Sequence, residues 1–150
     1  MTPFGFTIAL PPVTKKNHGQ LVDLGAKCPK CNRGKFSKML PSKPYEEYQT
    51  ECGFLLEALG VRGMRISGPV NVKATYYIDA DRKSDLVNYH AALHDVLVKF
   101  GVLEDDNRRV VAGTDGSRVH VDRMNPRTEV LIEPLPGGAR QMELDVRGGW

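Results

Sequence analysis

The most constraining feature of the sequence is a change of apolar repeat between residues 70 and 100. Residues 70–78 alternate apolar and polar side chains, which is typical of a half-buried strand that ends near Asp79. After a short basic turn, apolar residues recur three and four positions apart, which predicts an amphipathic helix from about residue 84 to residue 100. Its predicted buried stripe comprises Leu86, Tyr89, Leu93, Val96, Leu97 and Phe100. Gly101 follows as a suitable helix stop.

Weaker patterns complete the predicted fold. Four further strands are predicted at residues 4–10, 109–114, 118–122 and 128–133. Asp115-Gly116 is a pair typical of a β-hairpin turn, and residues 43–60 predict a second helix. We expect the α+β class: a small single domain with a mixed, mostly antiparallel sheet and two main helices on one face. Residues 1–133 would form this domain, and the Pro- and Gly-rich residues 134–150 a flexible C-terminal tail.

Charge is distributed unevenly along the chain. Residues 13–43 have little periodicity, carry eight basic residues and one acidic residue, and predict a long basic loop inserted into the domain. Residues 84–107 carry five acidic residues and one lysine. A basic loop beside an acidic pocket fits a metal-dependent enzyme that acts on nucleic acid, because basic groups attract the phosphates that carboxylates repel. The alternative is a solvated lysine-rich loop.

Aspartates cluster at both ends of the predicted central helix. Asp79, Asp81 and Asp85 surround its start, and Asp105 and Asp106 follow its end. Carboxylate oxygens are preferred ligands of Mg²⁺, whose shell is completed by waters and substrate phosphates. Asp85 alone is also explained as a helix cap. A helix of about 16 residues is about 24 Å long, so the two clusters meet only if the chain turns back along the helix or a second subunit contributes.

A recognisable order of motifs runs through the chain. Its parts are Pro11-Pro12 with Asn17, then D-R-K-S-D-L-V-N at residues 81–88, then L-x-D-x-L-x-K-x-G-x-x-x-D-D at residues 93–106. This order resembles the RusA family of Holliday-junction resolvases, which are small, dimeric, Mg²⁺-dependent endonucleases that nick four-way DNA junctions. The resemblance covers residues 6–132 and is specific between residues 79 and 111.

The resemblance implies roles for individual residues. By position, Asp85 matches the first aspartate of the family's D-L-D-N motif, Asn88 its asparagine, and Asp105 and Asp106 the acidic pair after the helix. It implies a homodimer that hydrolyses phosphodiesters with metal-activated water in DNA recombination and repair. Asp85 and Asp106 would hold Mg²⁺ or Mn²⁺, and Asp105 and Asp81 would complete or orient the shell.

Basic side chains near both motifs are candidates for DNA contacts. The candidates for binding DNA are Lys15, Lys16, Arg82, Lys83 and Asn88. Nothing in the sequence resembles a helix that reads bases in the major groove. Recognition is therefore expected to depend on the shape of the branched DNA rather than on its sequence.

Two positions depart from the family pattern. Val87 stands where D-L-D-N has its second aspartate, and Ala91 stands where a lysine is expected. Asp79 or Asp81 would have to replace the carboxylate, and Lys83 or Lys99 the cation. The alternative function is therefore that of a catalytically weakened protein that binds branched DNA without cutting it.

Cysteines supply another alternative. Cys28-Pro29-Lys30-Cys31 has the spacing of half a zinc knuckle, and His18 and Cys52 are the remaining candidates to complete four-coordinate zinc. A zinc-knuckle nucleic-acid-binding module and a turn with reduced thiols both fit this pattern. His90 and His94 also have the i, i+4 spacing of metal-binding pairs, but a solvent-facing or dimer-facing pair is the favoured interpretation.

The chain is expected to be cytoplasmic and to have no membrane partner. No apolar run approaches the roughly 20 residues that a transmembrane helix needs. The N-terminus lacks the charged and then apolar pattern of a signal peptide.

Overall fold

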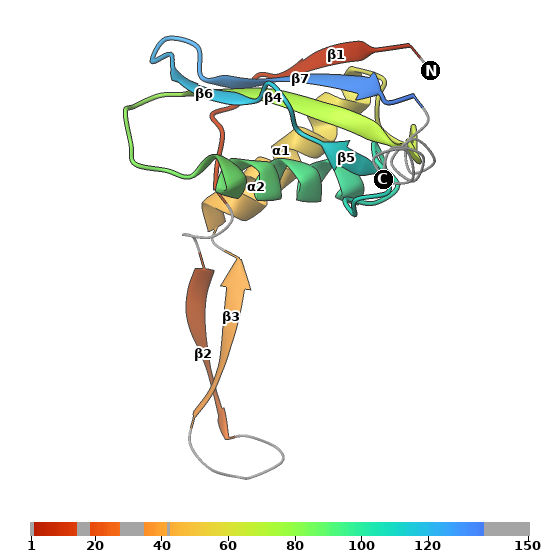
Figure 1. Ribbon diagram of the computed structural model, residues 1–150. Helices are drawn as coiled ribbons and strands as arrows, with labels where there is room; N and C mark the ends of the chain where they lie inside the picture. Colours follow the sequence, from red (N-terminus) through yellow and green to blue (C-terminus); the bar gives the residue numbers. More distant parts are fainter. Residues whose placement is uncertain (1, 15–18, 28–34, 42, 137–150) are drawn as a thin grey trace, which may run out of the picture.

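A mixed sheet covered on one face by two helices makes up the body of the protein (Figure 1). The computed structural model describes residues 2–14, 19–27, 35–41 and 43–136. Along the chain the elements are β1 (Phe4–Ile8), β2 (Gly19–Lys27), β3 (Lys35–Pro41), α1 (Lys43–Ala58), β4 (Val70–Ile78), α2 (Leu86–Lys99), β5 (Val111–Gly113), β6 (Arg118–Val121) and β7 (Arg127–Pro134). The predicted α+β class, with two helices on one face of the sheet, is confirmed.

The sheet is mixed and mostly antiparallel, as predicted. β7 lies between β1 and β4 and is antiparallel to both. β5 and β6 pair in parallel with the other edge of β4. β4 is therefore a central strand, and every second residue of it points toward the helices. This is why Val70, Val72, Ala74, Tyr76 and Ile78 are all buried.

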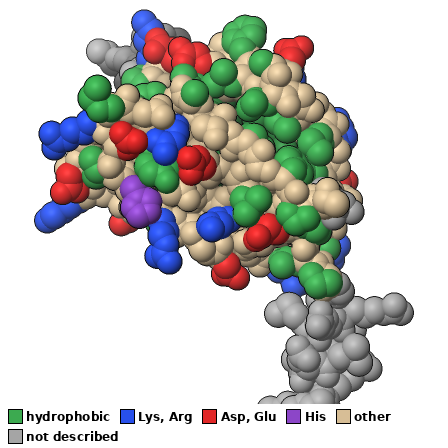
Figure 2. Space-filling view, turned by 90° about the horizontal axis from the view of Figure 1, so that it is seen from above, with side chains coloured by type: hydrophobic (Ala, Val, Ile, Leu, Met, Phe, Trp, Pro, Cys, Tyr) green, Lys and Arg blue, Asp and Glu red, His purple; other side chains and the backbone are tan. Residues whose placement is uncertain are grey.

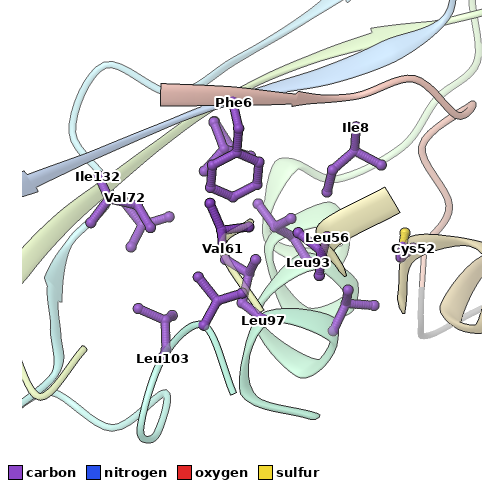
Figure 3. Close-up of a cluster of buried hydrophobic side chains, with 14 of the residues drawn as sticks. Phe6, Ile8, Cys52, Leu56, Val61, Val72, Leu93, Leu97, Leu103 and Ile132 are labelled. Atoms are coloured by element: carbon purple, nitrogen blue, oxygen red, sulfur yellow. The ribbon is translucent and has the colours of Figure 1, made fainter. Parts of the chain in front are cut away.

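The hydrophobic core lies between this sheet and the two helices (Figure 3). Phe6, Ile8, Val72 and Ile132 come from the sheet, and Cys52, Leu56, Leu93 and Leu97 from the helices. Leu93 and Leu97 are fully buried, as their helical spacing predicts. The core fixes α2 against β4, and so fixes the connection between them.

The end of α2 determines where the second aspartate cluster lies. Gly101 has φ +70° and follows the C-cap residue Phe100, as predicted for a glycine stop. The chain then pairs with residues 65–66: Arg65 N–H donates to the Gly101 carbonyl at 2.8 Å, and Glu104 N–H to the Ile66 carbonyl at 2.9 Å. This pairing draws the chain toward residues 65–66 rather than back toward the start of α2.

The predicted hairpin around Asp115-Gly116 is wrong. β5 and β6 do not pair with each other, and both lie along β4 as two parts of one edge strand. Between the pairs Asn71↔Gly113 and Thr75↔Arg118 the edge strand has one residue more than β4, which is the geometry of a bulge. Ser117 Oγ accepts a hydrogen bond from the Ala74 amide at 3.0 Å, so the interruption leaves this amide satisfied.

Asn71 holds this bulge in place. Its side chain is buried, its Oδ1 accepts from the Asp115 amide at 2.8 Å, and its Nδ2 donates to the Asp115 carbonyl at 3.1 Å. Asn71→Leu should destabilise the fold by about 2–3 kcal/mol, because polar groups on both sides lose their partners. Urea unfolding measures the change. Thr75→Val, on the same strand and face, is the control, and a loss below about 0.5 kcal/mol for Asn71→Leu would contradict this role.

The prediction of a long basic loop at residues 13–43 is also wrong. Within residues 13–43, β2 and β3 form an antiparallel hairpin with direct pairs from Gly19↔Pro41 to Lys27↔Lys35. It projects from the helix side of the body (Figure 1). Apolar residues in this segment do not alternate regularly, so the two-residue repeat that reveals β4 is absent from its sequence. Pro134, the first residue of the predicted tail, belongs to β7, and residues 137–150 of that predicted tail lie outside the described part.

Candidate functional site

The connection between β4 and α2 carries most of the predicted site residues. Asp79 forms an ion pair with Arg82, and both side chains are about half exposed. Asp81 and Lys83 are exposed beside them. Ser84 Oγ and the Tyr89 hydroxyl lie 2.8 Å apart and share a hydrogen bond, which ties the connection to the first turns of α2. The structure therefore brings Asp81, Arg82 and Lys83 together on one exposed segment.

Asp85 lies at the N-cap position of α2, but its side chain makes no capping hydrogen bond. Its backbone is extended, with φ −83° and ψ 133°, and its carbonyl accepts from the Asn88 amide at 3.0 Å. The capping explanation of this carboxylate is therefore not supported. The side chain is exposed, so its oxygens can take a ligand. Asn88 is half-buried one turn further along the helix.

A half-open pocket of about 390 Å³ lies beside this connection. One wall is formed by Pro11, Pro12, Val13, Thr14 and Pro44, and the other by Asp79, Arg82, Lys83, Ser84 and Tyr89. Thr14, Ser84 and Tyr89 were not among the predicted site residues. The prolines at residues 11–12 gave a signal for this wall, since they end β1 at the point where the chain passes the connection. The pocket combines two cations, hydroxyl groups and proline rings in one place.

The second aspartate cluster follows α2 and is organised by its own hydrogen bonds. Asp105 Oδ1 accepts from the Asp106 amide at 2.7 Å, and Asp105 Oδ2 accepts from Asn107 Nδ2 at 2.7 Å. These bonds, the first of them above all, hold the pKa of Asp105 below its usual range. Asp105 therefore shapes the turn through these bonds, and the side chains of Asp105 and Asp106 are both exposed.

The two clusters do not form one group within a single chain. The negative charge of Asp106 acts on His94, which lies nine residues after Asp85, or roughly 14 Å along the helix. Among the described residues, no three His, Cys, Asp or Glu side chains gather closely enough to hold a metal ion. Asp85 precedes α2 and Asp106 follows it, so the two carboxylates lie on chain segments at opposite ends of this helix.

His90 and His94 are half-buried on α2 and contact other rings. His90 Nδ1 and the Tyr76 hydroxyl share a hydrogen bond of 2.7 Å, and the two imidazole rings stack at 5.6 Å with an interplanar angle of 8°. Burial lowers the pKa of His90 to about 4 and also lowers the pKa of His94. Parallel rings cannot both aim their in-plane lone pairs at one ion. The solvent-facing interpretation is therefore not supported, the dimer-facing one stays a prediction, and the metal-binding one gains no support.

These histidines should make the fold sensitive to mild acid. The unfolded chain binds protons near the ordinary histidine pKa of about 6.5, whereas folded His90 resists protonation until about pH 4. Stability is full above pH 6.5 and falls as the pH drops toward 4, by about 1–2 kcal/mol for a partly exposed ring. Urea unfolding between pH 7.5 and 4.5 measures this loss. His90→Gln should flatten the curve, and an unchanged curve would contradict the assignment.

The outer face of the sheet offers no strong surplus of positive charge among the described residues. Figure 2 shows acidic and basic side chains interleaved near the β6 end. Arg127 lies over the Tyr77 ring at 3.8 Å and pairs with Asp122 at 2.9 Å and Glu129 at 3.1 Å. Since its charge is matched by two carboxylates, this face is a poor site for phosphates. The cationic side of the candidate site is at Arg82 and Lys83.

Several predicted residues lie outside the described part of the chain. They are Lys15, Lys16, His18, Cys28 and Cys31. Cys52 is described, is fully buried on α1, and has its thiol pKa raised to about 12 by burial. Burial in the core favours Cys52 as a small hydrophobe over a zinc ligand, and zinc binding at Cys28 and Cys31 stays a prediction. The interpretation of Cys52 as a small buried hydrophobe is confirmed.

Comparison with protein-family models and with curated proteins does not assign this chain to a family. The sequence matches no protein-family model and no curated protein. In the described part of the chain, no helix has the length and apolar character needed to cross a bilayer.

Proposed function

We propose that this protein is a Mg²⁺-dependent endonuclease that resolves four-way DNA junctions as a homodimer, in DNA recombination and repair. The resemblance of residues 79–111 to the RusA family motivates the proposal. It implies the reaction, hydrolysis of a phosphodiester by metal-activated water, and the branched substrate. Our proposal also includes a cytoplasmic location.

The proposal rests on the exposed carboxylate of Asp85, which makes no capping hydrogen bond. An aspartate at a helix N-cap ordinarily bonds to the amides of the first turn. Asp85 has the backbone position of a cap without that bond, is exposed, and directly follows Ser84, which lines a pocket together with Arg82 and Lys83. A carboxylate next to two cations suits a site where a phosphate and a metal ion meet.

The donor set fits a hard cation. Asp85 and Asp81 supply carboxylate oxygens, and Mg²⁺ needs only one or two of these with waters and substrate phosphate oxygens. When bound, Mg²⁺ or Mn²⁺ supplies Lewis acidity and a more acidic water. Arg82 and Lys83 bind the backbone phosphates and hold the scissile group near Asp85. Asp105 orients the turn that presents Asp106.

A second subunit accounts for the separation of the two clusters. Asp106 is exposed, and it follows α2 whereas Asp85 precedes that helix. In a homodimer, Asp106 of one subunit completes the site of the other. A symmetric dimer also suits a four-way junction, because two opposed strands must be cut together.

The test is incubation of the purified protein with a labelled synthetic four-way junction, with Mg²⁺ and separately with EDTA, followed by a denaturing gel. Paired, symmetric nicks that require Mg²⁺ are expected. A linear duplex of the same length is the control substrate and should remain intact. Nicks that persist in EDTA, or equal cutting of the duplex, would contradict the proposal.

One observation favours the alternative of a branched-DNA binder without catalysis. Val87 occupies the position of the family's second aspartate and is 72% exposed, so an apolar side chain faces solvent where a ligand is expected. A site with one carboxylate fewer at this end of α2 holds Mg²⁺ more weakly. Junction binding without nicks in Mg²⁺ or Mn²⁺ would establish this second function.

A further inference from the structure

Packing within a single chain does not explain how the hairpin of β2 and β3, called the arm below, is stabilised. Its two strands form a sheet of their own, separate from the five-stranded sheet. It extends away from the body instead of packing along it (Figure 1). A hairpin of two strands is at best marginally stable in water. An arm of this kind gains stability when a partner covers it.

The sequence of the arm indicates the charge of that partner. Residues 20–40 contain five basic residues and one acidic residue. The body has no comparable excess on the outer face of its sheet, where Arg127 is matched by two carboxylates. Charge complementarity therefore selects a polyanion as the partner of the arm over a second copy of the same basic arm.

The dimensions of the arm fit a groove of duplex DNA. Nine residues in β2 span about 30 Å, close to the length of one turn of DNA. The major groove is about 12 Å wide and admits a two-stranded β-ribbon. We propose that β2 and β3 form a DNA-binding arm that enters the major groove of one duplex arm of the substrate. This inference rests on the proposed action on DNA, but it concerns binding and not cleavage.

Removal of the arm tests the inference directly. Gly19 and Pro41 are paired, so their Cα atoms are about 5 Å apart and two glycines can replace residues 20–40. The shortened protein should fold, because the core residues that the structure describes all come from the body. Its affinity for a four-way junction should fall about 10- to 100-fold in 100 mM salt. The slope of log K against log salt should decrease by about 3–4, as each lost phosphate contact contributes about 0.9.

A charge-reversal variant avoids the deletion. Lys35→Glu with Lys38→Glu changes two charges in β3, and Arg118→Glu with Arg123→Glu makes the same change on exposed residues of the body. The first pair should weaken binding at least tenfold more than the second. Dimethyl sulfate footprinting should show protection of guanine N7, a major-groove atom, in the complex of the intact protein only.

Distinct results would overturn the inference. An unchanged affinity and salt slope after deletion would exclude the arm from DNA binding. A change from dimer to monomer in sedimentation, with the affinity per chain unchanged, would assign the arm to contacts between copies. If the intact protein binds through the arm but never nicks DNA, the inference stands and the proposed catalytic function fails.

Discussion

Asp85→Asn should reduce nicking of a four-way junction by at least about 10³-fold while leaving junction binding intact or tighter. The amide keeps the shape of the side chain and one oxygen, but it removes the charge that holds a hard cation. Binding is expected to hold or improve because a negative charge near DNA phosphates is lost. The fold should be unaffected, since the native carboxylate makes no capping bond and asparagine is as good an N-cap residue.

Single-turnover cleavage and equilibrium binding, measured on the same junction, check this expectation. Glu47→Gln, an exposed carboxylate-to-amide change on α1, is the matched control for net charge. It should leave nicking unchanged. If the folded Asp85→Asn protein loses binding as well as cleavage, Asp85 positions DNA and does not act as a metal ligand. Nicking at the native rate would remove Asp85 from the site altogether.

The body of the fold follows from repeats that are visible in the sequence. The three- and four-residue spacing of Leu93 and Leu97 predicts a buried helix face, and both side chains are fully buried. The two-residue alternation of β4 predicts its buried face in the same way. These predictions succeed because a local period reports directly which face meets the core.

Contacts between distant residues account for the predictions that failed. Asp115-Gly116 has the local chemistry of a hairpin turn, but Asn71, 44 positions earlier, binds the backbone of Asp115 and makes the turn a bulge in an edge strand. His90 is half-buried, and its ring meets the Tyr76 hydroxyl, 14 positions earlier. A local pattern contains no information about such partners.

The sequence predicted which residues make up the candidate site, but only part of their arrangement in space. The aspartates and cations of the connection before α2 lie where the sequence places them. The distance to Asp106 could not be predicted, because it depends on the pairing of residues 65–66 with the chain after Gly101. The pocket wall at Thr14 was missed for a related reason, since it forms where the end of β1 passes the connection.

Val87 is the position where a new carboxylate should increase the rate of catalysis most. It is the second residue of α2 and follows Asp85 by two positions at the exposed start of the helix. With 72% of its side chain exposed, Val87 contributes little to the core. Replacing it should not destabilise the fold.

Val87→Asp should increase the nicking rate about 10- to 100-fold at limiting Mg²⁺ and lower the Mg²⁺ concentration that gives half the maximal rate. The new carboxylate completes the D-L-D-N pattern beside Asp85, and a negative charge in the first turn also suits the helix dipole. Val87→Asn is the matched control, because it has the same shape without the charge. Mg²⁺ titrations of single-turnover cleavage separate the two variants. If the aspartate variant is no faster than the asparagine variant, the metal ion is not held at this end of α2, and the binding function without catalysis becomes the better account of Asp85 and its neighbours.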